Sequence, residues 1–419
     1  MSKQIFTSPR LDALRQVLEA GKNDVVDAFW DEISQQGAPL IEPVPDNLEQ
    51  SLVTFVWRGT AETKNVVVLG DLTSWDFAAN QMTRLAETNL WYRSYRMRND
   101  LRTTYLLAEN DSLIPFSETT DYAVRTAHFQ FDPLNPHTFV YLKDEEGINY
   151  GENTRSVLEL PAALPQPWAA FRADAPAGKI EEHRLRSEIL DNERRVWVYT
   201  PPNYTPDGRP YGLLLGFDGW GLIKWVNLPT ILDNLLAENR IPPLVAILPD
   251  SLGETRSTEL GCYPPFDDFL IQELLPWARQ IYHITDDPSQ SVIGGISLGG
   301  MASAYTSLRH PDIFGSVLSL SGAFFYSISH MSSVDWLVRQ FVGTEKLPLR
   351  FYMDAGLLET KVDPEEGISI LMGNRHMRDV LDAKGYSVHH AEFNGGHNPV
   401  CWRGTFADGL LALIDKKDN

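Results

Sequence analysis

The stretch GGISLGGMAS, residues 294–303, places a serine among glycines where one sequence pattern gives way to another. It follows the apolar run SVI (residues 291–293), typical of a buried strand, and leads into MASAYTSL (residues 301–308), typical of a helix. Glycines on both sides of a serine add conformational entropy that folding must remove, so stability alone does not explain them. We infer that the glycines serve the geometry of Ser297.

Gly295, Ser297 and Gly299 form the pattern G-x-S-x-G between a predicted strand and a predicted helix. In α/β-hydrolases this pattern is the nucleophile elbow, a sharp turn that projects the serine hydroxyl above the sheet. The backbone N–H of Leu298, which begins the helix, then faces an oxyanion. A serine that merely starts a helix would give the same letters, but only about 0.1 such pattern is expected by chance in a chain of this length. We therefore predict Ser297 as nucleophile and Leu298 as an oxyanion donor.

Composition excludes several classes of protein. The chain has 419 residues, 43% hydrophobic and 22% charged, as in ordinary globular proteins, and no apolar run approaches the ~20 residues that cross a membrane. A formal net charge of −20 argues against binding to nucleic-acid phosphates. The two cysteines, Cys262 and Cys401, argue against a disulfide framework. Charges run through the N-terminal segment where a secretory signal would be uncharged, so we expect a cytoplasmic protein.

The pattern along the chain predicts two domains. Ser8 as a cap and Pro9 in the first turn predict an opening helix, and residues 51–110 alternate as in a small antiparallel β-sandwich. Proline and alanine dominate residues 161–178, which we expect to form a semi-rigid linker. After residue 178 strands alternate with helices, as in a mostly parallel sheet covered on both faces. We predict a helix and a β-sandwich, which looks like the early-set immunoglobulin-like modules, over residues 1–160, and an α/β-hydrolase catalytic domain over residues 179–419.

A serine nucleophile needs a base, and the fold predicts where that base lies. In α/β-hydrolases the partners follow in the order serine, acid, histidine, with the histidine on the loop after the last strand. His397 follows the predicted strand YSVHHAEF (residues 386–393) and precedes the predicted closing helix. Of the ten histidines it alone has this place. We predict His397 as the general base rather than an ordinary histidine beside a glycine turn.

The acid of the triad is left open between carboxylates that follow the strand LRFYM (residues 349–353). Its task is to hold the imidazole tautomer and to stabilise the imidazolium that forms when serine loses its proton. Asp354 belongs to the strand end, whereas Glu359 lies on the loop beyond a glycine. We favour Glu359 over Asp354, with Asp363 as a third candidate.

A second oxyanion donor is expected on the turn after the strand LLLGF (residues 213–217). The sequence DGWG, residues 218–221, places Gly219 or Trp220 on that turn. An ordinary tight turn would explain the same residues equally well, so the two interpretations stay open.

Five longer segments together resemble the enterochelin (enterobactin) esterases, within the wider group of esterases related to esterase D. In the second half they are GISLGGMASAYTSLRHPDIFGSVLSLSGAFF (residues 295–325), ETRSTELGC (254–262) and GGHNPVCWRG (395–404). In the first half, VTFVWRG (53–59) and DPLNPHTF (132–139) are similar to the N-terminal domain of these enzymes. The resemblance therefore covers most of the chain.

The resemblance implies hydrolysis of the ester bonds of a cyclic trilactone of N-(2,3-dihydroxybenzoyl)serine, as its ferric complex, with release of iron inside the cell. Iron would arrive with the substrate, so no cofactor is expected. Because that complex is an anion and the protein is acidic, it needs cations near the site, and Arg256 and Arg403 flank the predicted site. Trp220, Tyr263 and Trp402 would offer stacking surface to catechol rings. Pairing of the arginines with local carboxylates, and packing of the aromatic rings, are the alternatives.

Two other functions remain open at this point. The segment VVVLGDLTSWDFAANQMTRL (residues 66–85) is similar to modules attached to glycan-processing enzymes, so the chain is alternatively a carbohydrate esterase that removes acetyl or feruloyl groups. A third reading is a non-catalytic protein that binds a siderophore or a glycan. The presence of Ser297, a suitable acid and His397 in the expected order favours an enzyme.

Overall fold

The computed structural model describes residues 8–22, 24–146, 152–326, 334–362 and 367–416. The chain forms two compact units. Unit 1 comprises Met1–Tyr141, Glu152–Leu164 and Asn394–Val400, and unit 2 comprises Leu142–Gly151, Pro165–Phe393 and Cys401–Asn419. The last segment of unit 1 therefore comes from the far end of the chain.

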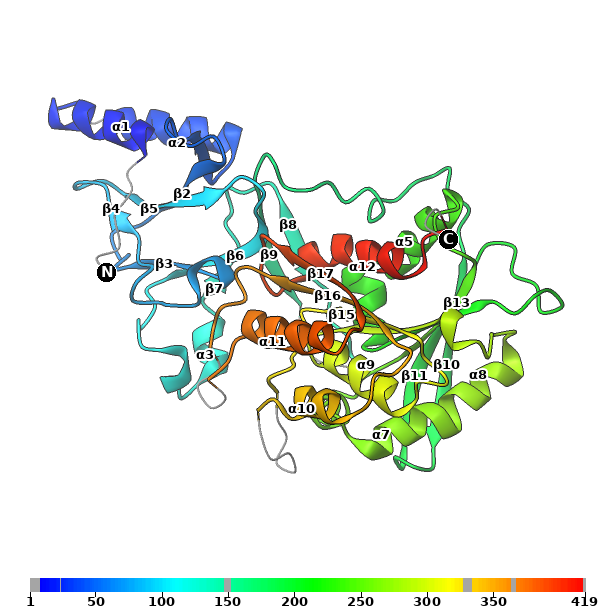
Figure 1. Cartoon of the computed structure of the whole chain (residues 1–419). Coiled ribbons are helices and arrows are strands. Elements are labelled where there is room, and N and C mark those ends of the chain that lie inside the picture. The colour runs from blue at the N-terminus through cyan, green and yellow to red at the C-terminus, as the bar shows by residue number, and fades with distance from the viewer. Residues whose placement is uncertain (1–7, 23, 147–151, 327–333, 363–366, 417–419) are drawn as a thin grey trace. The chain divides into compact units, whose positions relative to one another are not determined.

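Two antiparallel sheets form most of unit 1 (Figure 1), as the alternating pattern of residues 51–110 predicts. Their strand orders are β1-β2-β5-β4 and β3-β6-β9-β8, and β7 pairs with β6. Side chains of β5 alternate between buried and partly exposed from Leu90 to Ser94, as a strand with one covered face requires. The strands are β1 (Leu40–Pro43), β2 (Gln50–Arg58), β3 (Val66–Leu69), β4 (Thr83–Arg84), β5 (Leu90–Arg98), β6 (Arg102–Glu109), β7 (Phe129–Gln130), β8 (Thr138–Tyr141) and β9 (Asn153–Glu159).

Helices α1 (Pro9–Glu19) and α2 (Val25–Gln36) precede the sheets. The hydroxyl of Ser8 accepts a hydrogen bond from the N–H of Leu11, so the predicted cap is confirmed. Apolar residues of both helices, including Trp30 and Ile33, pack into one buried cluster with Val56 of β2. The short α3 (Tyr122–Thr126) lies between β6 and β7.

The second unit contains an eight-stranded sheet of order β10-β11-β13-β12-β14-β15-β16-β17. The pairs from β13 and β12 through to β17 are parallel, and β10 and β11 pair antiparallel at one edge. The predicted mostly parallel sheet is therefore confirmed. The strands are β10 (Lys179–Ser187), β11 (Asn192–Thr200), β12 (Gly212–Gly216), β13 (Leu244–Pro249), β14 (Ser291–Ile296), β15 (Ser316–Leu320), β16 (Arg350–Gly356) and β17 (Ser387–Phe393).

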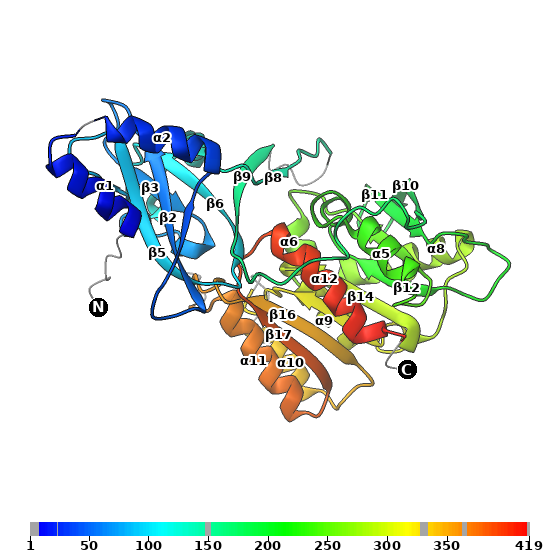
Figure 2. The same ribbon diagram turned by 90° about the horizontal axis from the view of Figure 1, so that it is seen from above.

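Helices cover both faces of this sheet (Figures 1 and 2), and a separate apolar core lies under each set. Because both faces are covered, β12, β13 and β15 are buried at every position and β14 at all but its last, without alternation. One face carries α5 (Leu228–Ala237) and α12 (Pro399–Ile414), and the other carries α7 (Pro264–Phe269), α8 (Leu275–Ile281), α9 (Leu298–Arg309), α10 (Trp336–Gly343) and α11 (Ile370–Ala383). Short α4 (Gly219–Gly221) and α6 (Arg256–Glu259) follow β12 and β13.

The predicted fold class, an all-β N-terminal domain followed by an α/β domain, is thus confirmed. The second half of the Pro/Ala-rich segment packs on unit 2, where the side-chain amide of Asn234 donates to the carbonyls of Trp168 and Ala170 at 2.8 Å each. In the described part of the chain, no helix combines the length and the hydropathy needed to cross a membrane.

Candidate active site

Ser297 lies where the chain leaves β14 and enters α9, as the elbow pattern predicts. Its backbone has φ 59° and ψ −118°, a conformation that residues with a side chain rarely adopt. Such strain costs of order 1–3 kcal/mol and tends to occur at functional sites, where the surrounding structure enforces it. Here the N–H of Ser297 donates to the carbonyl of Leu320 at 2.9 Å, and its own carbonyl accepts from Ala323 at 3.0 Å.

The glycines of the elbow allow the helix to approach the strand. A Cβ atom on Gly295 would lie 2.7 Å from the carbonyl carbon of Gly299, and one on Gly300 would lie 2.5 Å from the hydroxyl of Ser319. Both distances are below those of real contacts, so larger residues would force the elbow open. Gly300 and Met301 donate to the Ser297 carbonyl, which leaves the N–H of Leu298 ahead of the first helical bonds.

The turn after β12 lies beside the elbow because β12 and β14 are neighbours in the sheet. Gly216 pairs with Gly294, and the N–H of Phe217 donates to the Gly294 carbonyl at 3.1 Å. Gly219 then begins α4, and a Cβ atom there would lie 2.4 Å from the carbonyl oxygen of Leu248. The first N–H groups of a helix lack partners within it, so those of Gly219 and Trp220 stay candidates for the second oxyanion donor.

Asp218, which precedes this turn, forms a two-point ion pair with Arg256. Arg256 Nε lies 2.8 Å from Asp218 Oδ1, and Nη2 lies 2.7 Å from Oδ2. Asp218 Oδ2 is also 3.8 Å from the position of a Cβ on Gly299, which places the pair next to the elbow helix. The structure therefore shows the carboxylate pairing that the sequence left as an alternative, and substrate binding by Arg256 stays a prediction.

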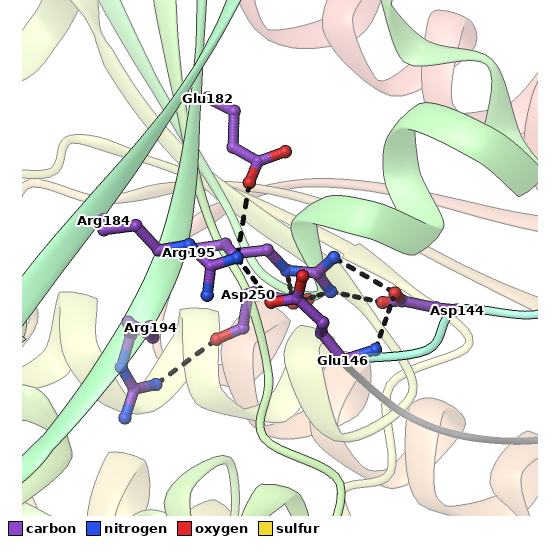
Figure 3. A network of polar contacts seen from close by, with 7 residues as sticks. All are labelled: Asp144, Glu146, Glu182, Arg184, Arg194, Arg195 and Asp250. Atoms are coloured by element: carbon purple, nitrogen blue, oxygen red, sulfur yellow. Dashed lines mark hydrogen bonds and ion pairs between the residues drawn. The ribbon is translucent and has the colours of Figure 1, made fainter.

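Buried ion pairs hold both ends of the segment that carries Arg256. At its start, Asp250 accepts from Nε of Arg195 at 3.0 Å, and Arg195 also binds Asp144 (Figure 3). At its end, Glu259 accepts from the buried guanidinium of Arg194 at 2.8 and 3.0 Å. Burial, reinforced by the negative charge of Asp144, raises the pKa of Asp250 to about 6 despite the opposing Arg195.

The two leading candidates for the triad acid differ in their surroundings. Asp354 is fully buried at the end of β16, where Oδ1 accepts from the N–H of Ser321 at 2.9 Å. Burial, with a smaller contribution from the charge of Glu359, raises the pKa of Asp354 to about 8, so at neutral pH it is mainly the uncharged acid. Glu359 lies on the following loop and accepts from the N–H of Gly356 at 2.7 Å. A neutral Asp354 stabilises an imidazolium poorly, which favours Glu359, while Asp363 lies outside the described residues.

His397 lies on the loop between β17 and α12, the place that chain order predicts. This loop clusters with unit 1, whereas Ser297 and Glu359 belong to unit 2. The backbone N–H of His397 donates to Oδ2 of Asp71, from the turn after β3, at 2.8 Å. Asp71 was not among the residues predicted from the sequence.

The remaining predicted residues of the binding site differ in exposure. Trp402 is buried in the core, and its indole N–H donates to the hydroxyl of Ser321 at 3.0 Å, so the structure favours packing for this residue over stacking on a substrate. Trp220 and Tyr263 are partly exposed. Nε of Arg403 donates to the carbonyl of Trp225 at 2.9 Å. Substrate contacts of Trp220, Tyr263 and Arg403 stay predictions.

Two carboxylates that contact predicted site residues, Asp218 and Asp71, are not predicted from the sequence, for different reasons. Asp218 stands directly before the predicted oxyanion turn, so its place in DGWG was a usable signal. Asp71 lies 326 positions from His397, and nothing local to either residue connects them.

Both halves of the chain match models of known families. Residues 187–413 match the family described as "Putative esterase", and residues 52–169 match the family described as "Enterochelin esterase, N-terminal". The order of the two matches is that of the two predicted domains.

Individual proteins similar to this chain are named as esterases of iron(III) enterobactin or iron(III) salmochelin. The iron(III) enterobactin esterase of Dickeya dadantii is 29% identical over 94% of this chain and 94% of its own. The iron(III) salmochelin esterase of Escherichia coli is 25% identical over 96% of this chain and 97% of its own. The crystal structure of the enterobactin esterase from Shigella flexneri in the presence of enterobactin is 27% identical, covers 92% of this chain and 97% of its own, and has a TM-score of 0.72.

Proposed function

Because the chain belongs to the enterochelin esterase family, we propose that it is a serine esterase that hydrolyses the ester bonds of ferric enterobactin and releases iron inside the cell. The observation that carries the proposal is the strained backbone of Ser297, in a glycine elbow between a central parallel strand and a helix. The match of the N-terminal region to the enterochelin esterase type supports a siderophore over a polysaccharide substrate.

In the proposed reaction Ser297 Oγ attacks the carbonyl carbon of a serine ester while His397 accepts the hydroxyl proton. The N–H of Leu298, with that of Gly219 or Trp220, stabilises the oxyanion of the tetrahedral intermediate. His397 then returns the proton to the departing serine hydroxyl, which leaves an acyl-enzyme. Water, deprotonated by the same histidine, hydrolyses this ester and restores Ser297.

Recognition of the ferric ligand is proposed to rest on a few cations and on aromatic surface. Tyr263 and Trp220 retain exposed ring surface that can stack on catechol groups. Arg256 has a planar fork that hydrogen-bonds oxygen while it stacks, but Asp218 already neutralises much of its charge. In this scheme the iron arrives bound to the substrate and is not a cofactor of the protein.

The proposal is tested by comparing three esters with purified protein: ferric enterobactin, p-nitrophenyl acetate and a feruloylated oligosaccharide. We expect turnover of the first two, with linear trimer, dimer and monomer of dihydroxybenzoylserine appearing in sequence by mass spectrometry. Turnover confined to the feruloylated oligosaccharide would replace this function with the carbohydrate esterase alternative.

The choice of substrate is tested further by Arg256→Ala and Arg256→Lys. If Arg256 contacts the ferric anion, kcat/KM for ferric enterobactin falls about tenfold more than kcat/KM for p-nitrophenyl acetate, and Lys recovers only part of the loss. Asp218→Asn is the matched control, because it breaks the same ion pair and keeps the arginine. Equal losses on both esters would assign Arg256 to support of the oxyanion turn instead.

A further inference from the structure

The histidine loop, residues 394–400, forms hydrogen bonds with residues of β6 and of two turns in unit 1. These contacts explain why a segment flanked by β17 and α12 clusters with the N-terminal unit. The hydrogen bonds run from Arg102 N–H to the Asn394 carbonyl (3.0 Å), from Asn394 Nδ2 to Asp100 Oδ1 (2.7 Å), from His397 N–H to Asp71 Oδ2 (2.8 Å) and from Asn398 Nδ2 to Thr103 Oγ1 (3.3 Å).

One of these hydrogen bonds, from the backbone N–H of His397 to Oδ2 of Asp71, involves the predicted catalytic residue itself. Its other carboxylate oxygen, Oδ1, accepts from the indole N–H of Trp75 at 3.1 Å. With each oxygen holding a different donor, the carboxylate has a defined orientation. Hydrogen bonds to an ionised carboxylate are also stronger than those between neutral groups. The bond therefore fixes the backbone from which the imidazole of His397 projects.

The residue before the histidine shows that this approach is built into the sequence. A Cβ atom on Gly396 would lie 2.2 Å from Asp71 Oδ2 and 2.5 Å from Asp71 Cβ, so only glycine leaves room for the carboxylate. Gly395 and Gly396 together also give the loop wide backbone freedom when it is unsupported. A loop of this kind needs an external anchor to present one conformation.

We propose that Asp71 is a positioning residue for His397, and that it acts by holding the backbone of the histidine loop. This inference rests on the proposed function, in which His397 is the base. Displacement of a catalytic group by about 1 Å can cost about 100-fold in rate, so loss of the anchor has a measurable effect without any change in the reacting groups.

The test uses Asp71→Ala in the full-length protein, with p-nitrophenyl acetate as a small neutral ester. We expect kcat to fall about 10- to 100-fold with KM changed less than about twofold, because substrate binding is untouched. Labelling of Ser297 by a fluorophosphonate, which also needs the base, should slow in parallel. Asp71→Asn should recover part of kcat, since its amide oxygen still accepts from the His397 N–H although its NH2 group cannot accept from Trp75.

Asp111→Asn is the control for general damage to unit 1. It breaks the buried pair in which Asp111 accepts from Nη2 and Nε of Arg125 at 2.8 and 3.0 Å, at contacts that do not involve the histidine loop. We expect a lower melting temperature with kcat per folded molecule unchanged.

Wild-type kcat in Asp71→Ala would overturn the proposal, as would equal losses in the Ala and Asn variants. If Asp71→Ala does not fold, the Asp71→Asn and Gly396→Ala variants carry the test, with a reduced kcat expected for both and a KM changed less than about twofold. Activity that survives in Ser297→Ala or His397→Ala would instead overturn the proposed function, so the two failures are distinguishable.

Discussion

The elbow and the histidine loop each present one predicted catalytic residue, but they are held in different ways. The elbow is fixed by its own neighbours in unit 2, through the bond of Ser297 to Leu320 and the close contact of Gly295 with Gly299. The histidine loop is fixed by side chains of unit 1, above all by Asp71. A geometry enforced by local backbone leaves a recognisable sequence pattern, whereas a geometry enforced by distant side chains does not.

The largest expected effect tests whether the two loops serve one reaction. Ser297→Ala and His397→Ala should each lower kcat by at least about 1,000-fold, and the double variant should be little worse, because residues that act as a unit give non-additive losses. The measurement is kcat on p-nitrophenyl acetate and ferric enterobactin, with circular dichroism to confirm folding. Losses that multiply in the double variant would mean that the two residues do not act together.

The second prediction concerns the acid that completes the site. Glu359→Gln should lower kcat by about 100-fold or more, because the imidazolium loses its negative partner. Asp354→Asn should change kcat less than about threefold, since the aspartic acid it replaces is mainly uncharged at neutral pH. Both variants are assayed at pH 7 on the same ester. A larger loss in Asp354→Asn would reverse the assignment.

The third prediction compares the two loops directly, by adding the same methyl group to each. Gly295→Ala pushes against backbone of Gly299, so we expect activity to be lost together with several degrees of melting temperature, about 2–4 °C for each kcal/mol. Gly396→Ala meets Oδ2 and Cβ of Asp71, of which Oδ2 can rotate away while Cβ requires a shift of the loop, so kcat should fall about tenfold with a smaller loss of melting temperature than in Gly295→Ala.

The control for this comparison is Gly396→Ala in an Asp71→Gly background. The methyl group then meets neither the carboxylate nor the Cβ atom of residue 71, so the Gly396→Ala change should cost little beyond the first. Fully multiplicative losses would show that Gly396 matters for a reason other than room for Asp71.

The sequence predicts those features of the fold that residues close together in the chain determine. The order of strands and helices in residues 179–419, the Ser8 cap and the strained Ser297 could all be predicted, because apolar periodicity and glycine spacing express them directly. The place of His397 followed from chain order. Helix α2 is not among the predicted elements, although the spacing of Phe29, Trp30 and Ile33 on one face is typical of a helix.

Other features depend on what folding brings together. Strand β10 is polar and partly exposed at a sheet edge, so it lacks the apolar run that marks the other strands. The buried state of Asp354 and the bond of Asp71 to His397 arise only in three dimensions. The sequence leaves stacking and packing open for Trp402, and the burial of its side chain in the core becomes visible only in the folded chain.

The last prediction concerns stability and not activity, and it follows from the raised pKa of Asp354. A carboxyl group with a folded pKa of about 8 keeps its proton in the native state when the unfolded chain, near its ordinary value of 3.8, has lost it. Its stabilising contribution is therefore complete below about pH 4 and is lost as the pH rises through 8. Between these values each pH unit lowers the free energy of unfolding by up to about 1.4 kcal/mol for one such proton.

Asp354→Asn cannot release a proton, so we expect its melting temperature to rise relative to that of the wild-type protein as the pH increases from 5 to 8.5. Glu392→Gln is a suitable control, because hydrogen bonding to Arg375 lowers the pKa of Glu392 and its contribution is constant over this range. The difference between Asp354→Asn and wild type, measured at half-unit intervals, isolates the single group from all others that titrate. Parallel curves for the two proteins would mean that Asp354 is ionised in the native state, and Asp354 would then regain its claim to be the acid that serves His397.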